Sequence, residues 1–197
     1  MNPSNDESKE TKELCSILLK LALELKRICD KYKLRYFLYD GSLLGAIRHS
    51  GFIPWDDDMD FILPRKDFKK FLEVAAKELK KPFYLQTLDN TKEIFNNGRI
   101  VLRMDNTTYV RNKVDLYVKD HQGIGIDILA LDNCPEDIKL RDKQWKKIDK
   151  YSGMLYMNKY GKNIKRFNVF SWGKLKTRFM YYLFCYGISW VRFPHFL

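Results

Sequence analysis

The first 150 residues alternate between stretches of helical and of strand periodicity. Apolar residues recur at every third or fourth position over three ranges, which predicts amphipathic helices at 11–31, 67–80 and 137–151. Shorter apolar or alternating runs predict strands at 36–39, 58–63, 100–104, 108–110 and 124–129. This mixture predicts an α/β (α+β) fold in which helices flank a small mixed sheet.

Two small residues separate the strand at 36–39 from a short predicted helix at 43–48. Gly41 and Ser42 predict a tight turn there, with the Ser42 hydroxyl capping the helix. The N-terminus of a helix offers unpaired N–H groups to a phosphate. Gly41 and Ser42 are therefore candidate substrate-binding residues.

An acidic cluster, Asp56-Asp57-Asp58-Met59-Asp60, leads into the strand at 58–63. Adjacent carboxylates repel one another unless a cation screens them. If the strand begins at Asp58, then Asp58 and Asp60 point to the same face, with their Cα atoms about 6.6 Å apart. Two carboxylates at that separation can share a hard divalent cation, and Mg²⁺ favours one or two carboxylates plus substrate phosphates.

Three other interpretations of this cluster compete with a magnesium site. A calcium-binding EF-hand loop is excluded, because Phe61 stands where that loop needs glycine. The Asp-x-Asp site of a glycosyltransferase, which also holds a metal and a nucleotide diphosphate, stays open. So does a solvated acidic turn without function, because Asp-x-Asp alone is a weak motif.

A lone acid interrupts the apolar strand Gly125-Ile126-Asp127-Ile128-Leu129. A buried carboxylate is costly unless it is paired or binds a metal, so Asp127 is a candidate third carboxylate. The alternative is an aspartate at a strand end that bonds to the backbone.

Charge is distributed unevenly along the chain. The net charge is +11, and no Asp or Glu follows Asp149. Nine basic residues fall in that last stretch: Lys150, Lys159, Lys162, Lys165, Arg166, Lys174, Lys176, Arg178 and Arg192. A basic segment of this kind suits an anionic partner, and the alternative is a solvated basic face.

The membrane is the partner expected for this basic segment. The apolar, aromatic run 179–191 is shorter than the roughly 20 residues of a spanning helix, which predicts no transmembrane helix. Its composition fits an interfacial helix or a buried core helix. The polar N-terminus is unlike a signal peptide, and the cysteines form no CxxC pair. We therefore expect a cytoplasmic protein, peripheral at the inner face of the membrane.

The segment from Tyr36 to Asp60, with Asp40-Gly41-Ser42, Gly51-Phe52-Ile53-Pro54 and Trp55-Asp56-Asp57-Asp58-Met59-Asp60, closely resembles the signature of the LicD family. Arg65-Lys66-Asp67-Phe68 continues the resemblance, as does Gly125-Ile126-Asp127-Ile128 with Asp132 and Pro135 behind it. The resemblance runs from about residue 11 to residue 140. The LicD family includes bacterial phosphocholine transferases and resembles fukutin-type enzymes.

The resemblance implies a nucleotidyltransferase-like fold of the polymerase-β type. It implies Mg²⁺ or Mn²⁺ at Asp58 and Asp60, with Asp127 as the third catalytic acid. It further implies a CDP-activated donor, usually CDP-choline, and a hydroxyl of a surface polysaccharide, lipopolysaccharide or teichoic acid as acceptor, with release of CMP. Nucleic acid is not an expected partner.

Three arginines are candidate substrate-binding residues, because guanidinium groups match phosphate oxygens: Arg48, Arg65 and Arg103. Each has a surface arginine as its alternative. His49 lies in the signature, where a structural role is as well supported as a catalytic one.

The predicted organisation is a disordered N-terminus at 1–10, a catalytic domain at 11–150 and a basic, aromatic, helical C-terminal segment at 151–197. Members of the family continue with a proline-rich segment, so this chain is expected to be short or truncated there. Two other functions stay open: a glycosyltransferase that uses a sugar nucleotide, and a non-catalytic relative that docks on the membrane.

Overall fold

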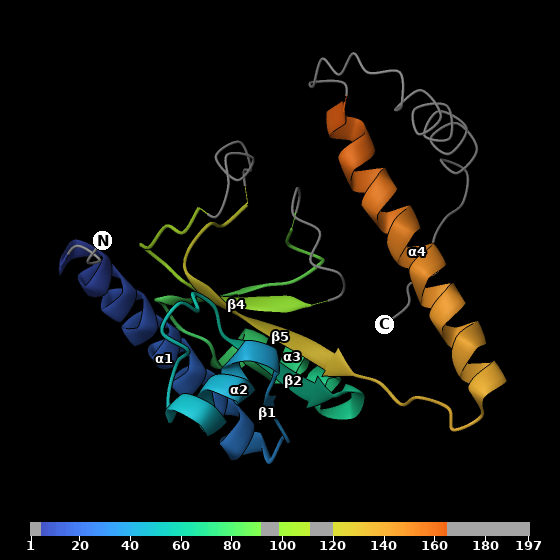
Figure 1. Ribbon diagram of the computed structural model, residues 1–197, viewed down its shortest axis with the longest axis horizontal. Coiled ribbons are helices and arrows are strands. Elements are labelled where there is room, and N and C mark those ends of the chain that lie inside the picture. The colour runs from blue at the N-terminus through green and yellow to red at the C-terminus, as the bar shows by residue number, and fades with distance from the viewer. Residues whose placement is uncertain (1–4, 92–98, 111–119, 165–197) are drawn as a thin grey trace. The chain divides into compact units, whose positions relative to one another are not determined.

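The computed structural model describes residues 5–91, 99–110 and 120–164, and the chain divides into two compact units, 1–133 and 134–197. The first unit contains three helices and five strands: α1 (Asn5–Tyr32), β1 (Phe37–Leu38), α2 (Asp40–His49), β2 (Asp60–Pro64), α3 (Arg65–Glu78), β3 (Phe83–Gln86), β4 (Ile100–Met104) and β5 (Gly125–Leu131). The second contains α4 (Ile138–Ile164). Figure 1 shows the arrangement within the first unit.

The five strands form one mixed sheet in the order β1-β2-β5-β4-β3. β2 and β5 run parallel, whereas β1–β2, β5–β4 and β4–β3 are antiparallel. The predicted α/β class with a small mixed sheet is therefore confirmed. The parallel pair lies at the centre of the sheet and sets Asp60 opposite Asp127.

Alternation along the central strands separates two faces of the sheet. Phe61 and Leu63 of β2, with Ile126 and Ile128 of β5, are buried in a core that α1 and α3 cover. Burying a side chain of this size contributes about 1.5–3 kcal/mol. The intervening residues, among them Asp60, point to the opposite face and stay partly exposed. We call this opposite side the polar face.

Most predicted elements are confirmed, with shifted ends. α1 begins at Asn5 and so extends into the residues 1–10 for which disorder was predicted. The limits of the predicted domain, 11–150, stay a prediction, and the segment 165–197 lies outside the described residues.

One predicted strand was wrong, and one observed strand was not predicted. Residues 108–110 form no strand. The Tyr109 N–H donates to the Gln122 carbonyl at 2.8 Å, and the Tyr109 hydroxyl donates to the Asp57 carboxylate. The four-residue strand β3 was missed, because it is too short to show alternation by itself. It is stabilised by its antiparallel partner β4.

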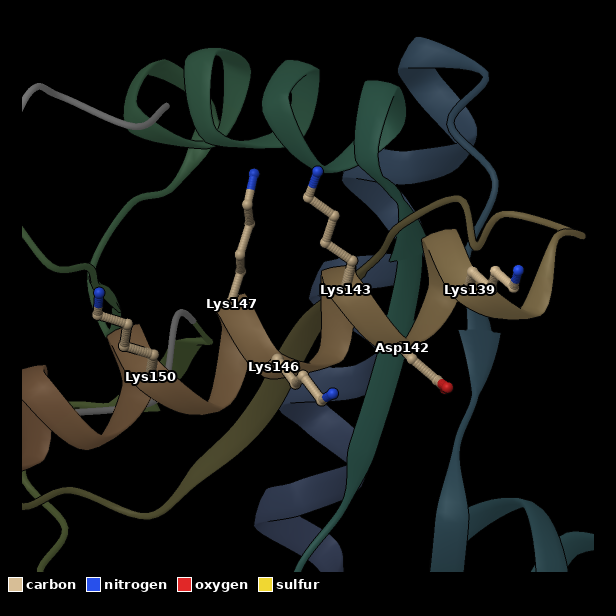
Figure 2. A pocket seen from close by; sticks show the side chains of 6 residues that line it. All are labelled: Lys139, Asp142, Lys143, Lys146, Lys147 and Lys150. Carbon is tan, nitrogen blue, oxygen red and sulfur yellow. The ribbon is translucent and has the colours of Figure 1, made fainter.

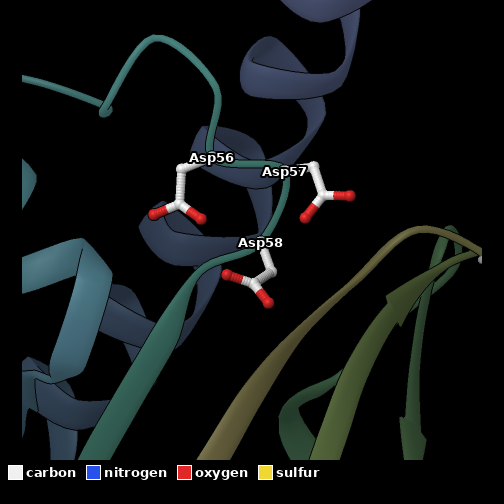
Figure 3. Close-up of side chains that lie close together, drawn as sticks. All are labelled: Asp56, Asp57 and Asp58. Atoms are coloured by element: carbon white, nitrogen blue, oxygen red, sulfur yellow. The ribbon is translucent and has the colours of Figure 1, made fainter.

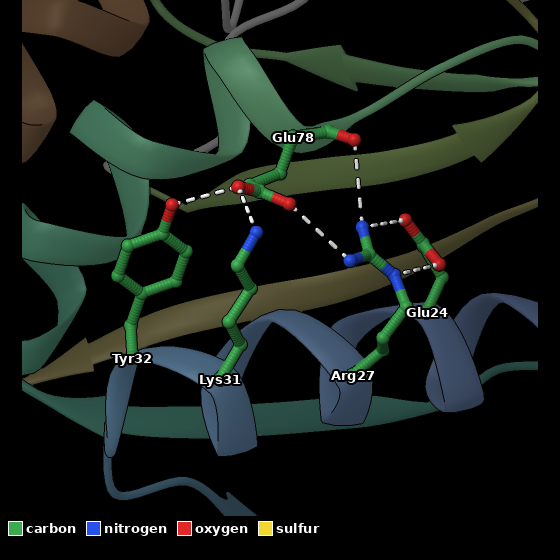
Figure 4. A network of polar contacts seen from close by, with 5 residues as sticks. All are labelled: Glu24, Arg27, Lys31, Tyr32 and Glu78. Carbon is green, nitrogen blue, oxygen red and sulfur yellow. Dashed lines mark hydrogen bonds and ion pairs between the residues drawn. The ribbon is translucent and has the colours of Figure 1, made fainter.

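Glu78, in the last turn of α3, ties α3 to α1 (Figure 4). Its carboxylate accepts hydrogen bonds from Lys31 and from the Tyr32 hydroxyl, both at 2.7 Å, and from Arg27 at 3.3 Å. Arg27 also donates twice to Glu24. The donors, Lys31 first and Tyr32 next, lower the pKa of Glu78 to about 2. This network fixes the two helices that cover the core.

Glu78→Gln is expected to lower the urea midpoint at pH 7, because it removes the carboxylate on which three donors converge. The folded pKa lies below the ordinary value, so the contribution is present above that value and is lost as pH falls towards 2. The difference from wild type should therefore shrink from pH 5 to pH 3. Glu73→Gln, which removes only a surface bridge to Lys70, is the matched control. A deficit for Glu78→Gln that is equal at both pH values would contradict the assignment.

Candidate active site on the polar face

Three acids are brought together where β2 and β5 run side by side. Asp60 and Asp127 are direct partners in the register, and the Asp127 N–H donates to the Met59 carbonyl at 3.0 Å. Neighbouring strands lie about 4.8 Å apart. Asp58 stands two residues before Asp60, in the segment that leads into β2, and its charge acts on Asp60. We call Asp58, Asp60 and Asp127 the β2–β5 acids.

The charges of Asp58 and Asp127 both act on the carboxylate of Asp60. Burial raises the pKa of Asp60 to about 6, and the charges of Asp58 and Asp127 add to the rise. Arg99 opposes it. Because two like charges next to a half-buried carboxylate are unfavourable, this place on the polar face favours a proton or a cation.

A second group of acids overlaps the first. Asp56, Asp57 and Asp58 offer one carboxylate oxygen each within 4.8 Å of one another, close enough to share a metal ion (Figure 3). Burial, then Asp58 and Asp57, raise the pKa of Asp56. We call these three the loop acids. Oxygen-only ligands suit Mg²⁺ or Mn²⁺, so the donor set fits the metal that the sequence implies, with Asp58 common to both groups.

Ser42 is placed differently from its prediction. α2 begins at Asp40, and no side-chain hydrogen bond caps it. Instead the Ser42 hydroxyl accepts the Asp60 N–H at 2.9 Å, and the Tyr39 N–H donates to the Asp60 carbonyl at 3.0 Å. The predicted helix cap is therefore wrong. Ser42 holds the strand end that carries the acids, and its contact with substrate stays a prediction.

Glycines let α2 approach the acidic loop. A Cβ at Gly41 would lie 2.6 Å from an Asp56 carboxylate oxygen. A Cβ at Gly45 would lie 2.6 Å from the Gly51 carbonyl and 3.1 Å from the Ile53 nitrogen. α2 therefore packs by its small residues, while its apolar side chains point outward and are exposed: Leu43 (44%), Leu44 (41%) and Ile47 (73%).

Arg99 was not anticipated from the sequence. Its Nη1 donates to Asp127 Oδ2 at 2.5 Å, and its positive charge opposes the rise in the pKa of Asp60. Alternation along 99–103 places Arg99 and Arg103 on the same face as Val101, which pairs with Asp127. The alternation along 99–103 is visible in the sequence. It places Arg99 beside Asp127 only once the pairing of β4 with β5 is known.

The three predicted phosphate-binding arginines lie on three different elements of this unit. Arg103 lies on the polar face, where Nε donates to Gln86 at 2.5 Å and Nη1 to the Gly123 carbonyl at 2.6 Å. Arg48 lies exposed in the last turn of α2. Their contact with phosphate stays a prediction.

Arg65 lies at the other end of β2 from Asp60. Its guanidinium forms a two-pronged pair with Asp132, 67 residues away, and lowers the pKa of that carboxyl. The two motif residues therefore pair with each other at the start of α3. This geometry gives Arg65 a structural partner, and its role toward substrate stays a prediction.

The far edge of the polar face carries an aromatic stack that the sequence did not suggest. His121 stacks on Tyr84 with ring centroids 4.7 Å apart. Its Nδ1 accepts the Gly123 N–H at 3.0 Å, so Nε2, 2.9 Å from Asp105, carries the proton. Tyr84 lies opposite Arg103, so the stack borders the arginine rather than the acids.

A scan against protein families matches residues 33–132 to the model described as LicD/FKTN/FKRP, nucleotidyltransferase domain. The chain belongs to this family. The matched range begins before β1, ends after β5 and contains the β2–β5 acids and the loop acids.

Among curated proteins, lipopolysaccharide cholinephosphotransferase LicD of Haemophilus influenzae is 41% identical over 63 residues, which are 32% of this chain and 24% of that protein. An uncharacterized protein of Rickettsia typhi is 35% identical over 57 residues, 29% of this chain and 18% of that protein. One of Rickettsia prowazekii is 38% identical over 50 residues, 25% of this chain and 19% of that protein. The chain thus matches about a quarter or less of each relative's length.

Proposed function

We propose that this protein is a metal-dependent phosphotransferase that moves phosphocholine from CDP-choline to a hydroxyl of a cell-surface glycan, such as a lipopolysaccharide or teichoic acid. The observation that carries the proposal is the pairing of Asp60 with Asp127, beside Asp58, inside the region that matches the family. The name of the Haemophilus influenzae relative, a lipopolysaccharide cholinephosphotransferase, supports phosphocholine as the transferred group and lipopolysaccharide as an acceptor. A nucleotidyltransferase-like fold of the polymerase-β type is part of the same proposal.

The β2–β5 acids would hold Mg²⁺ or Mn²⁺, which would offset the negative charge of the donor phosphates. The other groups have supporting roles. Ser42 and Tyr39 fix the backbone of Asp60 and so orient its carboxylate. Arg99 pairs with Asp127 and limits repulsion among the acids. The first turn of α2, with Gly41, faces the acidic loop and would accept a phosphate at its N–H groups.

The reaction balances without a further reagent. The glycan hydroxyl oxygen forms a bond to the phosphorus that bears choline, and the bond from that phosphorus to the oxygen of CMP breaks. The electron pair leaves with CMP. A carboxylate of the β2–β5 acids accepts the hydroxyl proton, which is within the ordinary capacity of a positioned aspartate.

A glycosyltransferase is the second candidate. The loop acids support it, because three consecutive residues gather around one metal position in the manner of an Asp-x-Asp site. This reaction would release UDP or GDP from a sugar nucleotide instead of CMP. A non-catalytic relative is the third candidate, and the retained acids argue against it.

A thermal-shift screen tests the proposal. CDP-choline, CDP-ethanolamine, CDP-ribitol and sugar nucleotides are each added with Mg²⁺ or with EDTA. CDP-choline with Mg²⁺ is expected to raise the melting temperature by several degrees, because a ligand at 100 times its Kd adds about 2.7 kcal/mol. EDTA should abolish the shift. A shift with sugar nucleotides alone would favour the glycosyltransferase, and an unchanged shift in EDTA would contradict metal dependence.

A further inference from the structure

The first half of α4 carries its lysines on one side. Five of them lie at spacings of three and four residues: Lys139, Lys143, Lys146, Lys147 and Lys150. At 100° per residue they fall within about 100° of the helix circumference. Figure 2 shows these side chains, with Lys143 and Lys147 extending in the same direction one turn apart. We call this set the lysine stripe.

A second stripe runs beside the first. It consists of large apolar side chains, all exposed, that occupy the next arc of about 160°: Ile138, Leu140, Trp145, Ile148 and Tyr151. Trp145, near its middle, is 57% exposed. The arc also contains the polar residues Arg141 and Gln144, and the acids Asp142 and Asp149 lie along the opposite border of the lysine stripe. We call the apolar set the tryptophan stripe.

We propose that this half of α4 docks on a bilayer surface that contains anionic lipids. A nucleic acid or an acidic polymer would engage the lysine stripe and leave the tryptophan stripe in water. A purely apolar partner would leave the lysines without counter-charge. An anionic lipid surface satisfies both, because apolar side chains enter the acyl boundary while lysines reach up to the phosphates.

Docking of this half of α4 overlaps the predicted contact of residues 150–197 only at Lys150 and Tyr151, and most of that segment lies outside the described residues. It does not require that α4 cross the bilayer. Among the described residues, every helix is too short or too polar for a span. The attraction should have two components, one that salt weakens and one that it does not.

Co-sedimentation of the full chain with phosphatidylcholine vesicles, with and without phosphatidylglycerol, tests the proposal. The protein should pellet with the anionic vesicles and less as salt rises. Lys143→Gln/Lys147→Gln should weaken this binding about 30-fold at low salt, since each basic residue near such a surface contributes about fivefold. Lys66→Gln/Lys77→Gln, exposed lysines of α3, is the matched control and should bind as wild type does. Trp145→Ala should weaken binding about tenfold at low and high salt alike.

Each alternative outcome overturns the proposal. Equal binding by the α4 and α3 lysine variants would place any membrane contact elsewhere in the chain. Sensitivity to the lysines but not to Trp145 would assign α4 to a polyanion. A lower melting temperature of Trp145→Ala with unchanged vesicle binding would make the tryptophan stripe a packing surface of the chain itself. No donor or turnover enters the assay, so its failure leaves the proposed function untouched.

Discussion

Asp60→Asn is expected to lower turnover by on the order of 10³-fold or more, and at the same time to make the metal-free protein more stable. Turnover falls because one of the metal-binding carboxylates is lost. Stability rises because burial, Asp58 and Asp127 make the charged form of Asp60 unfavourable in the folded chain. Activity and stability should therefore move in opposite directions, as they do where a site is strained for function.

The gain in stability should depend on pH. The pKa of Asp60 is raised to about 6 from an ordinary 3.8. The contribution of Asp60 to stability is thus fully present below pH 3.8 and is lost as pH rises through 6. In EDTA at pH 8, Asp60→Asn should exceed wild type by about 1–2 kcal/mol, after allowance for solvent screening, and the difference should shrink at pH 5.

Urea unfolding of both proteins in EDTA at pH 5 and pH 8 measures this difference. Asp89→Asn, the same change at an exposed turn, is the control and should leave stability and turnover near wild type. Added Mg²⁺ should stabilise the wild type and the control but not Asp60→Asn. A variant less stable than wild type at pH 8 in EDTA would show that Asp60 is not under the repulsion described here.

Gly45→Ala is expected to reduce turnover about 100-fold and stability by up to about 2 kcal/mol. The new Cβ would lie 2.6 Å from the Gly51 carbonyl oxygen. A backbone atom cannot move aside as easily as the end of a flexible side chain. Overpacking of this kind costs about 1–3 kcal/mol, whereas the better helix propensity of alanine returns about 1. Because α2 is tied to the Asp60 backbone through Ser42, a shift of α2 moves the acids, and displacement of about 1 Å costs about 10² in rate.

Gly51→Ala is the matched control, because its Cβ would meet only the His49 carbonyl at 4.0 Å, an ordinary contact. It should retain turnover and the wild-type urea midpoint. Steady-state rates and unfolding curves of the two variants give the comparison. If both variants behaved alike, the close packing of α2 on the Gly51 backbone would not be what positions the acids.

Local patterns in the sequence were sufficient for the main features of the polar face. Alternation alone placed Asp58 and Asp60 on one face, and an acid inside an apolar strand singled out Asp127. Each inference depends on one segment and on the two-residue period of a strand. The observed strand β2 begins at Asp60, two residues later than predicted, and the roles of the three acids stay predictions. The parallel register that sets Asp60 beside Asp127 then followed from the fold.

Pairing between distant segments was beyond local patterns. Arg99 approaches Asp127 only because β4 pairs with β5, and Arg65 meets Asp132 across 67 residues. Ser42 was predicted to cap a helix because serine favours that position. In the structure the Ser42 hydroxyl instead accepts a hydrogen bond from the Asp60 N–H. β3 was missed for the same reason, since its stability comes from β4.

A titration of bound Mn²⁺ by electron paramagnetic resonance tests most directly whether the β2–β5 acids form the metal site. The loop acids compete for that role, and Asp58 belongs to both groups, so Asp127→Asn and Asp57→Asn are the informative pair. The account predicts that Asp127→Asn weakens Mn²⁺ binding at least tenfold, while Asp57→Asn binds within about threefold of wild type. Unchanged binding in Asp127→Asn together with loss in Asp57→Asn would move the metal to the loop acids and contradict the account.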